Sequence, residues 1–157
     1  MKTLRIEGLP EFRWDDRLEW WTTRLSIHGR LIELSLEADD LPREALLDYT
    51  RGLIHQLQTA ELTIRQQAAD LLLPQYHTDW SKDLENPMDS ERMARHLTLQ
   101  DIAIASDPTA ELYYDDGGLF EGYTVIVRLD HALRTAGANL GSDPNGLPVS
   151  LAPLKPN

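Results

Sequence analysis

The sequence predicts an α+β fold, in which a central helical pair packs on one face of an antiparallel β-sheet. Two segments, residues 20–37 and 98–140, alternate apolar or β-branched residues with polar ones, which is the period of a half-buried strand. Between them the apolar residues recur every three or four positions, as on one face of a helix. Strands, then helices, then strands is an order typical of α+β folds rather than of alternating parallel α/β folds.

With 157 residues, the chain has the length of one domain and can bury a core without disulfides or metals. We expect residues 1–140 to form this single α+β domain. Residues 141–157 contain four of the nine prolines and few charges, which predicts a Pro-rich C-terminal tail.

The N-terminal part of the chain predicts a β-hairpin. Every second residue is apolar or β-branched in two neighbouring runs: Trp21, Thr23, Leu25 and Ile27, then Ile32, Leu34 and Leu36. Gly29 lies in the short gap between the runs, where a tight turn is expected. Trp20 and Trp21 are consecutive and must face opposite sides of the strand, one under the helices and the other toward solvent, a partner or the tail. A further strand is expected around Leu4–Ile6 or around Phe12–Trp14.

The central part predicts helices that begin near Pro42, because proline is favoured at the first helical position. One apolar face gathers four residues of the first helix: Leu46, Leu53, Ile54 and Leu57. Thr59 is expected to cap a second helix, whose apolar stripe contains Leu62, Ala69 and Leu73. Since no strong breaker separates the two, one long bent helix is the alternative. Pro74 lacks a backbone N–H, so the helix is expected to kink or end near it.

The remainder of the domain predicts a loop, a short helix and then strands. The segment from Gln75 to Pro87 is polar and is expected to form a loop with Trp80 as its large anchor. Asp89 is a good N-cap for a short helix that ends at about Leu97. Strands are then expected around Ile102–Ile104, Leu112–Tyr114, Tyr123–Leu129 and Ala132–Leu140, with turns at residues 107–108, 115–118 and 130–131.

The chain is acidic, with 26 Asp and Glu against 15 Lys and Arg and a formal net charge of −11. A negative protein is repelled by phosphate backbones and by anionic membrane surfaces, so we expect no nucleic-acid partner and no membrane partner. The chain has no Cys, no apolar run of about 18–20 residues and no apolar core of a signal peptide at its N-terminus. A cytoplasmic location is the resulting expectation.

Motifs that carry catalysis or bind cofactors are absent from the sequence, which contains no H-E-x-x-H, P-loop, G-x-G-x-x-G or G-x-S-x-G. His77 and Asp79 could face a cation, but no third ligand accompanies them. Residues 115–118 have the composition of a cation loop without the EF-hand spacing, and a hairpin turn is the favoured interpretation. We therefore expect a non-enzymatic protein with no catalytic residue, no cofactor and no metal.

The distribution of charge is more informative than its sum. No Lys or Arg occurs from His96 through Val127, so the carboxylates of this stretch have no cationic neighbour in sequence. If the stretch folds into adjacent strands and loops, it forms an acidic surface. The candidate partner-binding residues combine these carboxylates with aromatic side chains that could anchor a partner: Asp101, Glu111, Tyr113, Asp115, Asp116, Phe120, Glu121 and Tyr123.

Residues 112–127, LYYDDGGLFEGYTVIV, resemble a pattern found in a group of bacterial domains of unknown function. In that pattern an acidic-Gly turn is followed by Phe, any residue, Gly and His, then by an alternating strand and a strand of small residues. A Trp before the hairpin, the helical pair closing with Leu71-Leu72-Leu73, and Trp80 are also similar, so the resemblance covers about residues 14–141. Tyr123 stands where the pattern has His, so a role of that His is not carried over.

The resemblance implies a relation to immunity proteins of bacterial polymorphic-toxin systems, which bind and block a toxin made by the same cell. The main hypothesis is therefore a non-enzymatic binding protein of this type, whose acidic residues meet a basic toxin. The first alternative is a small ligand-binding or enzymatic domain, with a pocket between sheet and helices that uses His77, Asp79 and Tyr114. The second alternative is a homodimeric structural protein, joined by sheet pairing or by exposed Trp side chains.

Overall fold

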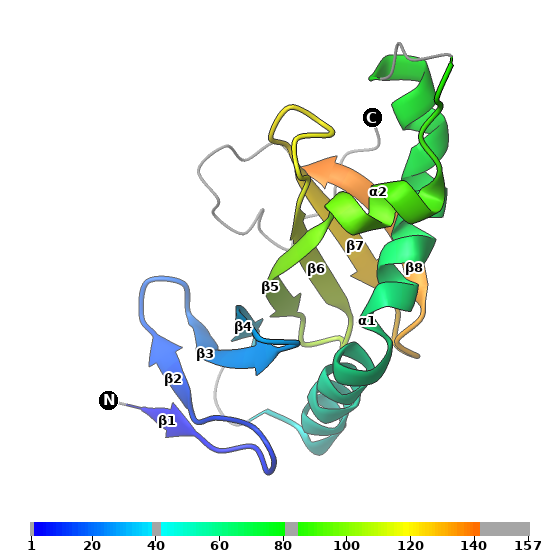
Figure 1. The fold of residues 1–157 in the computed structure, drawn as a ribbon. Helices are drawn as coiled ribbons and strands as arrows, with labels where there is room; N and C mark the ends of the chain where they lie inside the picture. Colours follow the sequence, from blue (N-terminus) through cyan, green and yellow to red (C-terminus); the bar gives the residue numbers. More distant parts are fainter. Residues whose placement is uncertain (1, 39–41, 81–84, 142–157) are drawn as a thin grey trace.

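The computed structural model of the chain describes residues 2–38, 42–80 and 85–141. Within these ranges the chain forms an eight-stranded sheet and two helices, which confirms the α+β fold (Figure 1). The strands follow chain order across the sheet, from β1 at one edge to β8 at the other. The expected C-terminal tail, and with it the covering of a Trp by tail prolines, lies outside the described residues.

The N-terminal half of the sheet is an antiparallel meander of β1 Thr3–Leu4, β2 Phe12–Asp15, β3 Trp20–Ile27 and β4 Arg30–Leu36. Both early strands that the sequence offered as alternatives are thus present. The β3–β4 turn places His28 at φ 50° and Gly29 at φ 78°, which is the left-handed backbone of a two-residue hairpin. The predicted hairpin around Gly29 is therefore confirmed.

The C-terminal half of the sheet contains β5 Thr98–Ile104, β6 Ala110–Asp115, β7 Thr124–Leu129 and β8 Thr135–Gly141, each antiparallel to the next. One pair departs from the antiparallel arrangement, because β4 and β5 run parallel with Leu34 opposite Ile102. The helical connection between these two strands explains the difference, since it returns the chain to the end of the sheet where β4 began.

Helix α1, Glu44–Asp79, consists of two helical segments that join at a kink with no loop between them, so this part of the chain is a long bent helix. The bend lies at Ala60, whose φ of −142° and ψ of 26° are not helical. Thr59 does not cap a second helix as expected, because its hydroxyl donates to the carbonyl of His55 at 3.0 Å, one turn back. A hydroxyl that bonds backward in this way often accompanies a bend in a helix.

The end of α1 differs from the prediction at Pro74. The helix continues through this proline to Asp79, so the loop expected from Gln75 onward begins later. Proline removes only one N–H from the ladder, and side chains hold the last turn: the Thr78 hydroxyl donates to the Pro74 carbonyl at 3.0 Å, and His77 Nε2 donates to the carbonyl of Met88 at 2.8 Å. Pro74 therefore does not end the helix, because these hydrogen bonds stabilise the turn that follows it.

Helix α2, Ser90–His96, begins as the sequence predicts. The Asp89 side chain accepts a hydrogen bond from the backbone N–H of Arg92 at 2.8 Å, which makes it the N-cap. The Leu97 amide then bonds back to the Ala94 carbonyl at 3.3 Å, and the chain enters β5 directly. This abrupt exit places the end of α2 beside the first residues of β5.

The hydrophobic core lies between the sheet and α1, with α2 on the same side (Figure 1). Alternate residues of the central strands face it: Leu34, Leu36, Ile102, Ile104, Leu112, Tyr114, Val125 and Val127. The helices contribute Leu53, Leu57, Ile64, Leu72 and Met93, each at most 1% exposed. Burying one such aliphatic side chain contributes about 1.5–3 kcal/mol, so this layer dominates the stability of the fold.

Trp20 and Trp21 are both buried, with 8% and 4% of their surface exposed. Trp21 belongs to the main core and packs edge-on against Trp14 at 5.2 Å between ring centroids. Trp20 is outside that core, and its buried indole Nε1 has no hydrogen-bond partner among the described residues. The expectation that one of the two packs under the helices is confirmed for Trp21, and Trp20 does not face open solvent. A cover of Trp20 by the tail, which the sequence analysis also offered, lies outside the described residues.

Candidate functional site

The structure divides the eight candidate partner-binding residues into two groups. Asp101, Glu111 and Tyr113 lie on strands β5 and β6, whereas the other candidates lie on the β6–β7 loop or at its ends: Asp115, Asp116, Phe120, Glu121 and Tyr123. The sequence predicts that all eight lie on one acidic surface. The loop group and the sheet group have different surroundings.

The β6–β7 loop, residues 115–123, is folded around the side chain of Asp116. This carboxylate is 3% exposed and accepts hydrogen bonds from the backbone N–H groups of Gly118 at 3.0 Å, Phe120 at 2.8 Å and Gly122 at 2.9 Å. Asp116 thus organises the loop and does not belong to the exposed surface on which the sequence placed it. A carboxylate bonded to several amides in this way fixes the backbone around it.

The backbone of the loop is also constrained where it meets α2. Gly117 adopts φ 61°, and a Cβ at this position would collide with the carbonyl oxygen of His96, so the position requires glycine. Glu121 adopts φ 57°, a left-handed conformation that is uncommon for a residue with a side chain. Its side chain is exposed. The loop therefore has one defined shape, with Glu121 projecting from it.

Four aromatic rings connect this loop to the end of α1. Phe120 is fully buried and packs edge-on against Tyr76 at 5.7 Å and against Trp80 at 5.6 Å. Trp80 in turn packs edge-on against Tyr123 at 6.0 Å, and Tyr123 is 44% exposed. Phe120 is therefore unavailable as the partner anchor that the sequence suggested. Tyr123 is the exposed end of the aromatic series, and Asp115 and Glu121 are exposed beside it in the same loop.

The sheet group lies on the face opposite the helices. Asp101 is the register partner of Glu33 on β4 and of Tyr113 on β6, while Glu111 is opposite Arg128 on β7. The Tyr113 hydroxyl donates to Glu111 at 2.9 Å, and both residues are buried. Glu111 and Tyr113 thus form a buried hydrogen-bonded pair, and Asp101 is the more accessible of the three residues.

Burial changes the acidity of both sheet carboxylates. It raises the pKa of Asp101, and the neighbouring Glu33 raises that pKa further. Burial also raises the pKa of Glu111, although the Tyr113 hydrogen bond and the charge of Arg128 oppose the shift. Ionisation of these two carboxylates therefore opposes folding. Among the candidate residues, the exposed negative charges are those of the β6–β7 loop.

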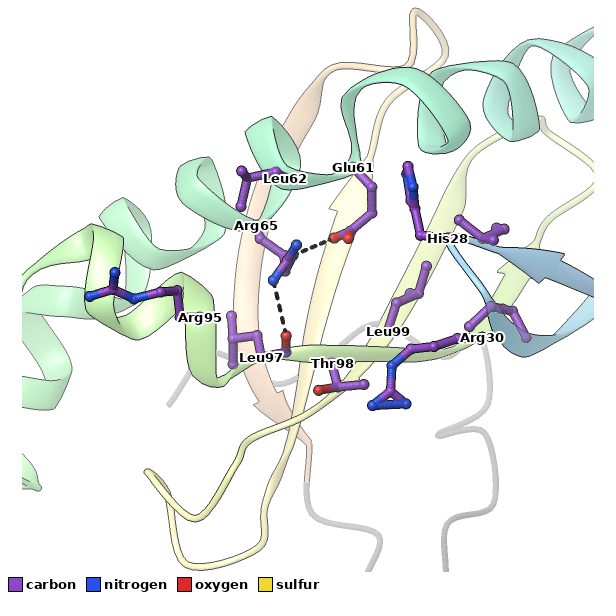
Figure 2. A pocket seen from close by; sticks show the side chains of 11 residues that line it. His28, Arg30, Glu61, Leu62, Arg65, Arg95, Leu97, Thr98 and Leu99 are labelled. Atoms are coloured by element: carbon purple, nitrogen blue, oxygen red, sulfur yellow. Dashed lines mark hydrogen bonds and ion pairs between the residues drawn. The ribbon is translucent and has the colours of Figure 1, made fainter.

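A cleft of about 420 Å³ lies between α1, α2, the β3–β4 turn and the start of β5 (Figure 2). A pocket between sheet and helices was one alternative drawn from the sequence, but none of the residues named for that pocket lines this cleft. Its polar lining centres on Glu61, whose Oε2 accepts from Arg65 Nε at 2.8 Å and from the Tyr114 hydroxyl at 2.9 Å. Arg65 Nη1 also donates to the carbonyls of Ala94 at 3.1 Å and Leu97 at 3.4 Å. Arg65 therefore joins α1 to the C-terminal end of α2.

One signal of this network was present in the sequence. Glu61 and Arg65 are four residues apart, which is the spacing of an ion pair on one helix. The third member, Tyr114, comes from a strand that lies more than fifty residues away in sequence. Burial and the charge of Glu61 raise the pKa of Tyr114, so its hydroxyl remains a donor to the carboxylate.

The alternative site of His77, Asp79 and Tyr114 is not assembled. None of the three lines the cleft; the His77 ring is bonded to the Met88 carbonyl, and the Tyr114 hydroxyl is bonded to Glu61. In residues 2–38, 42–80 and 85–141, no group of three or more His, Asp or Glu side chains could hold a metal ion. No helix within these ranges is long and apolar enough to cross a membrane.

A comparison with protein families places the chain among known sequences. The family model described as an uncharacterized protein conserved in bacteria, DUF2262, matches residues 7–140. The chain belongs to the DUF2262 family. The match confirms one part of the resemblance drawn from residues 112–127, namely that the chain is similar to bacterial domains of unknown function. Comparisons with curated proteins and with solved structures give no match.

Both sites lie within the segment that the DUF2262 model covers. The loop around Asp116 and the cleft around Glu61 are each built from elements between residues 7 and 140. The loop presents an exposed aromatic ring with carboxylates, whereas the cleft gathers arginines beside an apolar floor. The two sites therefore suit different ligands, and each is tested separately below.

Proposed function

We propose that this DUF2262 protein is a non-enzymatic binding protein that holds a basic protein partner through its β6–β7 loop. The observation that carries the proposal is Tyr123, a 44% exposed ring on a loop of defined shape, with Asp115 and Glu121 exposed beside it. Exposed tyrosines are frequent energetic anchors of protein interfaces. The carboxylates would supply the complementary charge for a basic partner.

Preorganisation of the loop supports this proposal. Asp116 holds three backbone amides, and Phe120 and Trp80 support Tyr123 from the side of α1. A loop that already has its bound shape loses little conformational entropy when it binds. The strain at Glu121, a residue with φ 57°, is also typical of positions retained for function.

The charge of the chain, and of the sequence segment around the loop, favours a basic partner. The loop belongs to the stretch from His96 through Val127, which contains no Lys or Arg, in a chain of net charge −11. Opposite potentials accelerate association and disfavour wrong partners. A toxin that acts on nucleic acid must itself present a basic surface, so neutralisation of such a toxin is the specific form of the proposal, and it rests on the resemblance to immunity proteins.

The loop is tested by charge reversal combined with removal of the anchor. The variant Glu121→Lys/Tyr123→Ala should lose a partner that the wild-type chain captures from native lysate at low salt, since it lacks both the charge and the ring. The control Glu7→Lys changes an exposed carboxylate in the connection between β1 and β2 and should retain the partner. Captured proteins are identified by mass spectrometry, and association rates are then measured with the purified partner at two salt concentrations.

Two results would contradict the proposal. One is a partner that binds the loop variant and the wild-type chain with equal affinity. The other is a captured protein that is acidic and whose association does not slow as salt rises, because complementary charge predicts that screening reduces the association rate. Asp116 is left unchanged in this test, because replacing it would disrupt the loop itself.

A further inference from the structure

The cleft between α1, α2 and the β3–β4 turn has the size of a small-molecule site. Its volume is about 420 Å³, and ligand pockets commonly occupy roughly 300–1,000 Å³. Figure 2 shows Arg95 of α2 at one end and His28 and Arg30 of the hairpin at the other, with Arg65 and Glu61 of α1 between them. Three arginines and one carboxylate thus line a single cleft of an otherwise acidic protein.

Arg65 is the fixed cation of this cleft. Its Nε and Nη1 are bonded to Glu61 and to two carbonyls at the end of α2, which leaves Nη2 without a protein partner within the described residues. Its side chain is 22% exposed, so the guanidinium is held in one orientation and partly removed from water. Glu61 is already neutralised by Arg65 and by the Tyr114 hydroxyl.

Arg30 and Arg95 supply charge that the protein does not compensate. Arg30 begins β4 and makes no ion pair within the described part of the chain. Arg95 approaches Glu91 at 3.8 Å, but both side chains are more than half exposed, and such surface pairs contribute little. Two exposed guanidinium groups therefore border an opening in which a third is fixed.

The floor of the cleft is apolar. Ile32, Leu97 and Leu99 are 1%, 1% and 6% exposed, and Leu62 lies at the rim with 49% exposed. Guanidinium groups pair bidentately with carboxylates and phosphates, whereas the apolar floor favours a hydrocarbon group. The fitting ligand is therefore a small organic molecule with one oxyanion and a short apolar body.

The bend of α1 lies beside this cleft. Ala60 leaves the helical conformation directly before Glu61, and His28 Nε2 donates to the Leu57 carbonyl at 3.1 Å on the preceding turn. His28 itself adopts φ 50° in the hairpin turn. Two locally unfavourable conformations, the bend and the left-handed His28, thus meet at the cleft, and such strain tends to accumulate at binding sites.

We infer that this cleft binds a small organic oxyanion, a carboxylate or a phosphate monoester with an apolar group, through Arg30, Arg65 and Arg95. Arg65 orients the oxyanion, and Arg30 and Arg95 close on it from the two ends of the cleft. The apolar group lies on Ile32 and Leu99. The site uses none of the loop residues that hold the proposed protein partner.

The test is an NMR titration of the ¹⁵N-labelled full chain with benzoate, phenyl phosphate, inorganic phosphate and neutral benzyl alcohol at constant ionic strength. We expect saturable shifts of the Leu97–Leu99 amides and of Arg65 Nε–H, with a dissociation constant below about 1 mM for at least one aryl anion. Inorganic phosphate should bind more weakly, because it lacks the apolar group, and benzyl alcohol should not bind. Comparing benzoate with phenyl phosphate shows which oxyanion the cleft prefers.

Matched variants separate specific binding from general attraction. Arg30→Gln/Arg95→Gln should weaken binding of the preferred aryl anion by about tenfold or more, since each loses a charge-assisted hydrogen bond. Arg17→Gln, which changes an exposed arginine in the β2–β3 turn, should leave binding unchanged, as should Tyr123→Ala. The inference is overturned if neither aryl anion gives saturable shifts at these residues, or if the double variant, shown to be folded by its spectrum, binds as the wild-type chain does.

Discussion

Three carboxylates that look alike in the sequence have different roles because their burial differs. Asp116 is buried and accepts three amides, Glu61 is buried against Arg65 and Tyr114, and Glu121 is exposed. Burying a carboxylate is costly unless its oxygens accept hydrogen bonds, and the oxygens of Asp116 and Glu61 accept them from their neighbours. Only Glu121 remains available to a partner.

The role of Asp116 predicts a large effect of a small substitution. Asp116→Ala removes the acceptor of three amides, one of which belongs to the buried Phe120, and should lower the free energy of unfolding by about 2–4 kcal/mol. Urea unfolding followed by Trp fluorescence measures this change. Asp115→Ala, whose exposed carboxylate accepts one amide from Gly117, is the control and should cost less than about 1 kcal/mol. Equal effects would show that Asp116 does not organise the loop.

At the scale of elements, α1 is bent where the β3–β4 turn docks against it. His28 bonds the Leu57 carbonyl, which belongs to the turn just before the non-helical Ala60. The end of the same helix persists past Pro74 because Tyr76 and Trp80 pack on Phe120. At both departures from the expected helix boundaries, tertiary contacts therefore act together with the local hydroxyl bonds of Thr59 and Thr78.

Because the β3–β4 turn contacts α1 through His28, we expect that removing this side chain loosens the bend of the helix. His28→Ala should lower the free energy of unfolding by about 1 kcal/mol through loss of the bond to Leu57. It should also accelerate amide hydrogen exchange selectively at residues 57–64. His55→Ala changes an exposed histidine of the same helix and should have neither effect. Unchanged exchange in His28→Ala would mean that the bend does not depend on the turn.

At the scale of the whole molecule, the sheet carries charges of like sign side by side. Glu33 and Asp101 are register partners on the parallel strands β4 and β5, on the face opposite the core. Like charges directly opposite each other on a sheet are destabilising. The parallel pairing that the helical crossover imposes therefore brings together two carboxylates that are distant in sequence.

This pairing predicts a pH dependence of stability with a defined sign. The pKa of Asp101 is raised in the folded state, so its destabilising contribution grows as pH rises from its unfolded value of about 3.9 through the folded pKa. Asp101→Asn should raise the free energy of unfolding at pH 7 by about 0.5 kcal/mol, and this difference should vanish below about pH 3.5. Urea unfolding at several pH values, with Glu7→Gln as the exposed control, measures it. A destabilised Asp101→Asn variant at pH 7 would contradict the assignment.

Much of the fold was predictable, whereas little of the candidate sites was. The alternation around Leu34 and Val125, the cap at Asp89 and the turn at Gly29 depend on neighbours a few residues apart, and the structure confirms them. The sites depend on burial and on contacts between distant segments. The eight candidate partner-binding residues therefore fall into two groups, and the residues that line the cleft around Arg65 were not foreseen.

Sequence alone determined the α+β class, the order of strands and helices along the chain, and the turn at residues 115–118, because periodicity and turn chemistry are local properties. The tertiary structure decided that β4 and β5 are parallel, that Asp116 and Phe120 are buried, and that Glu61, Arg65 and Tyr114 meet. These outcomes required the long helix to cross the sheet and pack on it. No local pattern encodes which side chains such a crossing brings within hydrogen-bond distance.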